Sequence, residues 1–332
     1  MEAASPRPIL RASICIPTRN RAELLRLTLE SLDRQTISAD RFEVIVGDDG
    51  STDETVAMLG GLRPRYPLSW RRATGSGPGA ARNAAAGAAE NDVLIFLDDD
   101  QLASPDLVAA HLDAHERSGV VLVQGDYPLA DGCDRDGASM VFERSRVRTL
   151  GSWRRGALAS VHLWGANFSV RQQSWRQVGG FDESLPRSQD LDFGLRIADL
   201  GVPLIVELGA VSHHLHRVST RGYRLQCFSE GRCMVRISRK RGVALETLLN
   251  SRLNRPLDRI LTRIWTRYPR WADAGGRLLT GLARAADLVE VRPAQVWSSR
   301  MLRRFHELGG IALEAASPAP VFPTVSIVDQ RS

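Results

Sequence analysis

The sequence predicts an α/β fold in which a mostly parallel β-sheet is flanked by helices and followed by a C-terminal helical extension. Three observations support this prediction. Short apolar stretches alternate with helical patterns up to about residue 112, the stretch 93–97 is apolar throughout, and the pattern changes beyond His216. Strands that alternate with helices form parallel sheets joined by right-handed crossovers. At 332 residues, the chain fits one large domain with an appendage or two unequal domains.

Two strand–helix units are expected first. An apolar strand at 12–16 is followed by PTRN (17–20), and the next residues carry leucines at helical spacing. The second strand, 42–46, is followed by GDDGSTD (47–53), in which a glycine turn and capping side chains begin another helix. Both strands are therefore followed by polar loops on the same edge of the predicted sheet.

The central stretch 93–97, VLIFL, is followed by Asp98, Asp99 and Asp100. A third strand at 68–72 and an Ala-rich helix ending near Ala89 precede it. Five consecutive apolar residues indicate a strand buried on both faces. Three carboxylates at its end repel one another unless a cation or a cluster of donors lies among them. Because ligands bind at the carboxyl ends of strands in open α/β sheets, the triplet predicts a metal–diphosphate site; the alternative is a solvated acidic turn.

The alternation continues after residue 100. The expected elements are a helix that begins at Ser104-Pro105, a strand at 120–123, a surface loop at 130–137, an extended stretch at 161–170, a helix from Gln189 that Gly201 stops, and a strand at 203–206. Asp190 and Asp192 lie in the first turn of their helix, where carboxylates suit the helix dipole. That dipole effect is the non-catalytic interpretation of Asp192.

The C-terminal region holds the excess positive charge. Residues 217–304 contain 20 basic and 6 acidic residues, so with a total of +6 the remainder carries −8. Apolar residues at helical spacing and arginines at every fourth position predict a basic amphipathic helix near 255–270. Its expected use is packing with a solvated arginine face; the alternative is contact with a membrane surface or an acceptor. Because Lys240 is the only lysine, the arginine bias is weak support for nucleic acid, and none is expected as a partner.

Other classes of protein are disfavoured by composition. No apolar run approaches the roughly 20 residues of a transmembrane helix. The N-terminus lacks a signal segment, and the four cysteines show no zinc or redox spacing. A cytoplasmic protein is expected, with peripheral contact at the inner membrane face as the alternative.

Seven motifs occur in the order and spacing of glycosyltransferase family 2, and residues 12–216 resemble that family. The motifs are ICIPTRNR, VGDDGSTD, GPGAARNAAAG, FLDDD, GANFSVR, GGFDE and QDLDFGLRI. The resemblance implies a GT-A fold and inverting transfer from a nucleotide-diphosphate sugar, expected to be a UDP-sugar, with Mg²⁺ or Mn²⁺. We divide the chain accordingly into a catalytic domain (1–216), an Arg-rich α-helical extension (217–315) and a flexible tail (316–332).

The resemblance also implies roles for individual residues. On the donor side these are Pro17 and Arg19 beside the nucleotide, Asp49 accepting from the uracil N–H, Arg82 near the diphosphate, Asp98 and Asp99 on the donor, and Asp100 with His214 as metal ligands. Asp190 matches the general base, which would remove the proton of the acceptor hydroxyl. Asn167, Asp182 and Gln189 are the acceptor-side candidates.

Two positions depart from the family pattern. Gln189 stands where a glutamate is usual, so either Asp190 is expected to ionise readily, with the acidic limb of activity at low pH, or the acceptor differs from that of the family. Gly47 stands where a bulkier apolar residue is common, which is expected to leave room beside the nucleotide base.

Two other functions are weighed against glycosyl transfer. Gln189 favours a catalytically inactive sugar-nucleotide-binding protein with a regulatory or scaffolding role. A nucleotidyltransferase would need a glycine-rich loop after the first strand, where PTRN has no glycine. The acceptor is left open among a lipid-linked glycan, a polysaccharide, a peptide and a small natural product.

Overall fold

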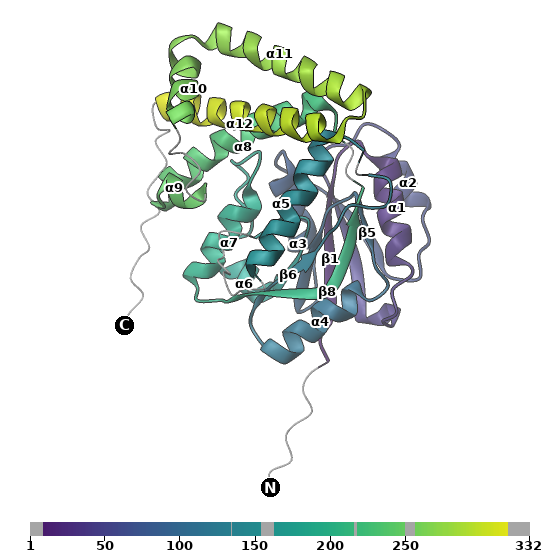
Figure 1. Cartoon of the computed structure of the whole chain (residues 1–332). Helices are drawn as coiled ribbons and strands as arrows, with labels where there is room; N and C mark the ends of the chain where they lie inside the picture. The colour runs from purple at the N-terminus through teal and green to yellow at the C-terminus, as the bar shows by residue number, and fades with distance from the viewer. Residues whose placement is uncertain (1–8, 134, 154–162, 216–217, 250–255, 318–332) are drawn as a thin grey trace, which may run out of the picture. The chain divides into compact units, whose positions relative to one another are not determined.

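A computed structural model describes residues 9–133, 135–153, 163–215, 218–249 and 256–317, and it confirms the α/β class (Figure 1). The strands are β1 (Ala12–Thr18), β2 (Phe42–Asp48), β3 (Leu68–Arg72), β4 (Val93–Leu97), β5 (Gln101–Ala103), β6 (Leu122–Asp126), β7 (Asn167–Arg171) and β8 (Leu204–His214). The helices of the first 219 residues are α1 (Ala22–Leu32), the 3₁₀ turn η1 (Ala39–Arg41), α2 (Thr55–Gly61), α3 (Pro78–Gly87), α4 (Leu107–Ser118), α5 (Gly137–Trp153), α6 (Gln172–Gln177) and α7 (Gln189–Asp199). The later helices are α8 (Thr220–Arg241), α9 (Leu245–Leu248), α10 (Pro256–Arg267), α11 (Pro269–Leu288) and α12 (Arg292–Ala316).

The strands form one sheet in the order β3-β2-β1-β4-β7-β6-β8-β5. The first four are parallel, whereas β7 runs antiparallel to both β4 and β6. The expected mostly parallel sheet is therefore confirmed. Because β2, β1 and β4 are parallel neighbours, their carboxyl ends lie side by side at one edge of the sheet.

Alternate residues of the central strands point to opposite faces of the sheet. Ile14 and Ile16 pack with the leucines of α1, α2 and α4, whereas Cys15 packs with the alanines of α3 and with Phe193 of α7. The VLIFL strand follows the same rule, which explains its apolar run, because both of its faces are covered by helices. This two-sided core fixes the strand ends that carry the site.

Several elements were not predicted from the sequence. The short strand β5 and the helices α5 and α8 were missed, and β8 continues well beyond the expected 203–206. The expected extended stretch 161–170 is only partly confirmed, since β7 begins at Asn167 and residues 161–162 lie outside the described part of the chain.

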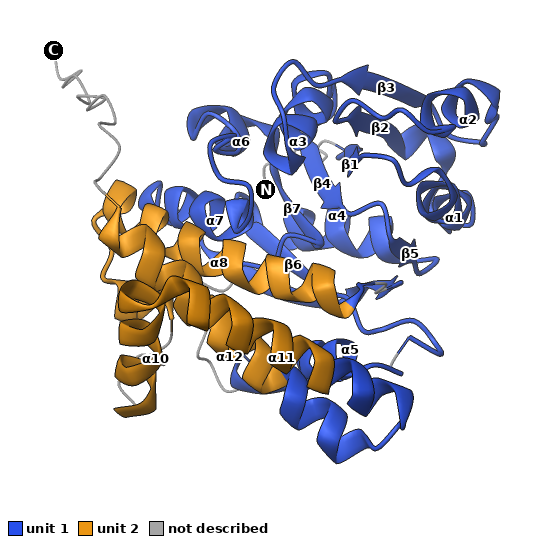
Figure 2. Cartoon of the chain, turned by 90° about the horizontal axis from the view of Figure 1, so that it is seen from above, with its two compact units in different colours: residues 1–219, 283–299 blue, residues 220–282, 300–332 orange. Residues whose placement is uncertain are grey.

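The chain clusters into two compact units, coloured in Figure 2. Unit 1 comprises residues 1–219 and 283–299, and unit 2 comprises 220–282 and 300–332. The return of 283–299 to unit 1 differs from the linear division at 216. It follows from contacts such as those of the Gln295 amide, which donates to the Arg135 carbonyl (2.8 Å), and of the Gly137 N–H, which donates to Asp287 (2.9 Å).

Unit 2 is a helical body held by close helix packing and buried ion pairs. At Gly231 of α8 a side chain would collide with the Glu307 carbonyl of α12, 2.1 Å from the position of a Cβ. Arg304 donates to buried Asp258 (2.7 Å), and Arg236 donates to Glu314 (2.7 Å). Of the expected tail, residues 318–332 lie outside the described residues, and none of the described helices is long and apolar enough to cross a membrane.

Candidate active site

Carboxylates and basic side chains converge where β1, β2 and β4 end. Thr18, the last residue of β1, donates to Asp99 (2.7 Å). Arg21 donates to Asp99 (2.6 Å) and to Asp100 (2.8 Å), so one guanidinium bridges two of the three aspartates. Arg21 was not among the predicted residues, although it lies within the ICIPTRNR motif; nothing in its spacing showed that it would reach the end of β4.

The two bridged aspartates titrate differently. Burial raises the pKa of Asp99 to about 7, although the charge of Arg21 opposes the rise. Burial also opposes ionisation of Asp100, but the hydrogen bond and charge of His214, together with Arg21, lower its pKa to about 2. Asp100 is therefore ionised at neutral pH, whereas Asp99 is close to the midpoint of its titration.

His214 reaches the aspartates through the pairing of two distant strands. Strand β5 follows the DDD triplet directly and pairs antiparallel with the end of β8, with Gln101 opposite His214. The Leu215 N–H donates to the Asp100 carbonyl (2.9 Å) and fixes this register. The Nε2 atom of His214 lies 3.4 Å from Oδ1 of Asp100. Two expected metal ligands are thus adjacent.

These donor atoms fit one divalent cation incompletely. Carboxylate and imidazole are both common ligands of Mn²⁺-type ions, and a spacing of 3.4 Å allows both to contact the same ion. Among the described residues, however, no group of three or more His, Cys, Asp or Glu residues could hold a metal ion. A cation here would need phosphate or water oxygens to complete its coordination, as is usual for Mg²⁺ bound with a diphosphate.

The expected nucleotide side lies on β2 and the start of α3. Asp49 accepts from the Gly77 N–H (2.8 Å) and from Arg19 (3.2 Å), and each carboxylate oxygen retains a lone pair for a further donor. Arg82 of α3 donates to Asp98 (2.6 Å). Its buried Nε has no hydrogen-bond partner among the described residues, so the guanidinium has unused donor capacity at the head of the sheet.

The structure corrects the interpretation of Gly47. This residue pairs with Pro17 across β1 and β2, and the expected room beside it is absent. A Cβ at Gly47 would lie 1.9 Å from the Ala81 carbonyl oxygen, because the backbone of α3 packs directly on β2 at this point. The glycine is required for helix–sheet packing.

Asp190 lies on a separate element but is joined to β4 by a short loop. Its Oδ2 atom accepts from the Gly165 N–H (2.8 Å), and the neighbouring Ala166 carbonyl accepts from the Asp98 N–H (3.2 Å). A Cβ at Gly165 would come within 3.1 Å of Oδ2, so glycine permits this approach. The expected base is thereby tied to the metal-side carboxylates through two adjacent residues.

The environment of Asp190 contradicts the expected low-pH acidic limb. Burial raises the pKa of Asp190, and the backbone N–H groups of Leu191 and Gly165 and the charge of Arg82 only partly oppose the rise. Desolvation, rather than the absence of a neighbouring glutamate, therefore determines the direction in which the pKa of Asp190 shifts.

Asp192 points away from Asp190, as two positions two residues apart on a helix must. It is fully buried and pairs with Arg196 (2.9 Å), one turn later. Arg196 also donates to the carbonyls of Val178 and Gly180, both at 2.6 Å. Asp192 therefore holds the arginine that anchors the GGFDE turn.

The three acceptor-side candidates have local structural contacts. The amide of buried Gln189 donates to the Leu185 carbonyl (2.7 Å), a bond that a glutamate could not make when ionised. Asp182 caps its own turn by accepting from Ser184. Asn167 is fully buried; it donates to the carbonyls of Asp126 and Ala210 and contacts His111 (2.9 Å).

Aromatic residues that were not predicted surround the metal-side histidine. His214 meets the ring of Phe142 edge to face at 5.2 Å and that of Tyr127 at 6.2 Å. Trp164 contacts Tyr127 at 5.4 Å and precedes Gly165, the residue that contacts Asp190. The sequence pattern did not predict these contacts. Phe142, for example, lies on helix α5, which the sequence did not predict.

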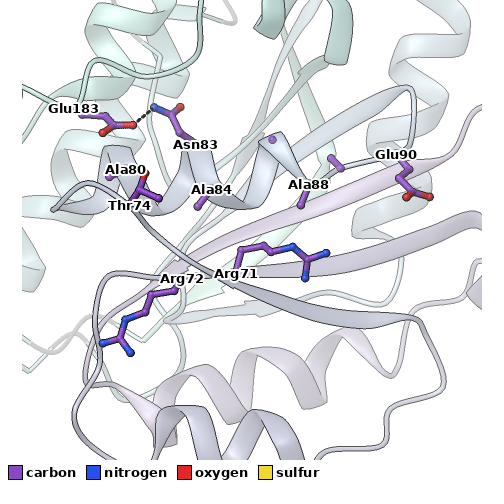
Figure 3. A pocket seen from close by; sticks show the side chains of 11 residues that line it. Arg71, Arg72, Thr74, Ala80, Asn83, Ala84, Ala88, Glu90 and Glu183 are labelled. Carbon is purple, nitrogen blue, oxygen red and sulfur yellow. Dashed lines mark hydrogen bonds between the residues drawn. The ribbon is translucent and has the colours of Figure 1, made fainter.

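Among the surface hollows of unit 1, two are lined by described residues other than those at the ends of β1, β2 and β4. One, of about 670 Å³, is lined by Asp131, Cys133, Arg135 and Leu215, beside the end of β8. The other, of about 700 Å³, lies between α3 and β3; Figure 3 shows Arg71 and Arg72 on its strand side and the Asn83–Glu183 hydrogen bond (2.9 Å) on its rim. Neither hollow is lined by the aspartates at the strand ends.

A family model matches the part of the chain that contains Asp49, Arg82 and Asp98–Asp100. The family model described as "Glycosyl transferase family 2" matches residues 13–179. Validoxylamine A glucosyltransferase of Streptomyces hygroscopicus subsp. jinggangensis is 30% identical over 258 residues, which cover 68% of this chain and 61% of that protein. The matching protein of subsp. limoneus is 29% identical, with 68% and 56% covered. The chain thus spans about three fifths of the length of these relatives.

Solved structures resemble the fold across nearly the whole chain. The mannosyltransferase PcManGT of Pyrobaculum calidifontis, in complex with GDP-Man and Mn²⁺, superposes with a TM-score of 0.64 at 20% identity and covers 93% of this chain and 88% of that one. TarS of Staphylococcus aureus gives a TM-score of 0.52 at 17% identity, with 86% and 55% covered. These likenesses confirm the expected GT-A-type fold.

Proposed function

The chain belongs to glycosyl transferase family 2, and we propose that it transfers a sugar, with inversion, from a nucleotide-diphosphate donor to an acceptor hydroxyl. One observation carries the proposal: residues 165–166 contact both Asp190 and Asp98, so a candidate base and the β4 carboxylates flank one small region. Inversion needs that arrangement, because the base and the leaving diphosphate act on opposite sides of the anomeric carbon.

The donor is proposed to bind over the ends of β1, β2 and β4. Asp49 would accept from a uracil N–H, and Arg82 would donate to the diphosphate through guanidinium N–H groups that Asp98 does not occupy. Asp100 and His214 would hold Mg²⁺ or Mn²⁺. When bound, the cation would neutralise charge on the departing diphosphate. UDP is the proposed nucleotide, whereas the fold neighbour PcManGT was solved with GDP-Man.

Asp190 is proposed to remove the acceptor proton. Its raised pKa brings the carboxylate closer to the basicity that efficient proton removal near neutral pH requires. Trp164, partly exposed beside Gly165, is positioned to contact a sugar ring bound next to the base. Because the Gln189 amide has a structural partner, the residue no longer favours an inactive binding protein.

The donor-binding proposal is tested by thermal shift with UDP, GDP and their sugars, each with Mn²⁺ or with EDTA. We expect UDP with Mn²⁺ to raise the melting temperature of the native protein and EDTA to abolish the shift. Asp100→Asn should remove the metal-dependent shift and leave the fold intact. Asp113→Asn, an exposed carboxylate on α4, is the matched control and should behave as the native protein. An equal UDP shift in EDTA, or in Asp100→Asn, would refute metal-assisted binding at this residue.

A further inference from the structure

The helices α10 and α11 expose apolar side chains that their sequence pattern would place in a core. Among the described residues, sixteen large hydrophobic side chains are exposed, and six of them lie within residues 256–282: Leu257, Ile260, Tyr268, Trp271, Leu278 and Leu282. This stretch is 27 residues long, so the exposed apolar surface is concentrated there. Trp271 is 77% exposed and Leu278 is 67% exposed.

Three of the four exposed large apolar residues of α11 share one face, and the fourth, Leu288, lies about 100° away around the helix. Leu278 follows Trp271 by seven residues and Leu282 follows by four more, a spacing that returns to the same side of a helix with about 100° per residue. The opposite side already packs, because Ala272 and Gly276 are buried and a Cβ at Gly276 would lie 2.5 Å from His306 of α12. The exposed face is therefore additional to the packing that folds unit 2.

Arginines border this face and outnumber the acidic residues of the same stretch. Residues 256–282 expose five arginines, at 259, 263, 267, 270 and 277, whereas Asp258 is buried in its pair with Arg304 and Asp273 pairs with Arg277. Arg267 and Arg270 flank Tyr268 and stand beside Trp271, at the turn where α10 meets α11. Within the described part of the chain, neither of these two arginines pairs with a carboxylate.

We infer that the α10–α11 face, defined by Arg267, Tyr268, Arg270, Trp271, Leu278 and Leu282, docks on a bilayer surface that contains anionic lipids. Apolar side chains would enter the boundary between headgroups and acyl chains, arginines would contact lipid phosphates, and Tyr and Trp favour that boundary. This mode of attachment needs no membrane-spanning helix.

Other occupants fit the face less well. A symmetric contact with a second copy would bring Arg267 and Arg270 toward their own equivalents, which like-charge repulsion disfavours. A soluble polyanion would pair with the arginines but leave Leu278 and Leu282 in water. The combination of both side-chain types selects an anionic lipid surface.

Vesicle flotation of the full chain tests this inference. We expect binding to vesicles of equimolar phosphatidylglycerol and phosphatidylcholine, and little binding to phosphatidylcholine alone. Trp271→Ala with Leu278→Ala, and separately Arg267→Gln with Arg270→Gln, should each weaken binding about tenfold or more. Binding should also weaken as salt rises from about 0.15 M to about 1 M.

Matched variants separate this face from general surface properties. Val120→Ala with Leu200→Ala removes two exposed apolar side chains elsewhere, and Arg11→Gln with Arg34→Gln removes the same charge from exposed sites of unit 1. Both pairs should bind vesicles as the native protein does, with melting temperatures confirming that every variant folds. The inference is overturned by absent vesicle binding, by equal losses in the control pairs, or by a native dimer in sedimentation that Trp271→Ala with Leu278→Ala dissociates.

Discussion

The two carboxylate groups of the candidate site differ in what surrounds them. At the end of β4, Asp98, Asp99 and Asp100 are contacted by Arg82, Arg21 and His214. At the start of α7, Asp190 has backbone N–H donors and no ion pair in the described residues. The first group is built to sit among cations, which suits a diphosphate and a metal. The second is a desolvated carboxylate that is free to change its protonation state.

The largest expected effect comes from Asp190→Asn. Removing a general base should lower the turnover number about 10²- to 10⁴-fold while metal-dependent UDP binding persists. Because burial disfavours the charged form of Asp190 in the folded protein, the neutral asparagine should keep or raise the melting temperature. Single-turnover assays with the donor identified by thermal shift provide the measurement. Native turnover in this variant would remove Asp190 from the mechanism.

Asp192→Asn is the comparison for Asp190→Asn, because it removes a carboxylate from the same first turn of α7 and should affect stability and not turnover. This substitution removes the carboxylate partner of Arg196, whose side chain is 12% exposed, and breaking a largely buried pair costs about 3 kcal/mol or more. That exceeds the about 0.3 to 1 kcal/mol expected from a dipole contact alone. Urea unfolding measures the loss. A stability equal to that of the native protein would show that Arg196 finds other support.

The pH profile is expected to show the smallest effect, and it tests whether Asp190 differs in pKa from an ordinary aspartate. A base must be ionised, so the raised pKa of Asp190 should place the acidic limb of kcat/KM above the ordinary aspartate value of 3.8. Stability must be measured alongside, because burial lowers the pKa of His111 to about 4. The unfolded chain therefore takes up a proton that the folded chain refuses between pH 6.5 and about 4, and stability falls as pH falls through that window. An acidic limb below pH 3.8 in protein shown to be folded would contradict the assignment.

Sequence reasoning located the strand ends but not the contacts between them. The apolar run at 93–97 and the polar loops after each strand identified β1, β2 and β4, because burial on both faces leaves a clear pattern. Arg21 could not be found in this way, since its reach to Asp99 and Asp100 depends on how the loop after β1 folds. Gly47 was misinterpreted for a related reason, because the residue that packs against it, Ala81, is distant in sequence. The contacts of Asn167 with Asp126 and Ala210 also join segments that are distant in sequence, so they could not be predicted.

The pairing of β5 with β8 has a consequence for the order in which the protein folds. Gln101 and His214 are distant in sequence, so the histidine joins the aspartates only after a large loop of chain has closed. The pairing of Ala12 with Phe42 spans 30 residues (42 − 12) and that of Ala12 with Val93 spans 81 (93 − 12), against 113 (214 − 101) for Gln101 with His214, so β1, β2 and β4 can pair earlier. During refolding, affinity for the nucleoside should therefore appear before affinity for the metal. The delay between the two would measure how long β8 takes to pair with β5.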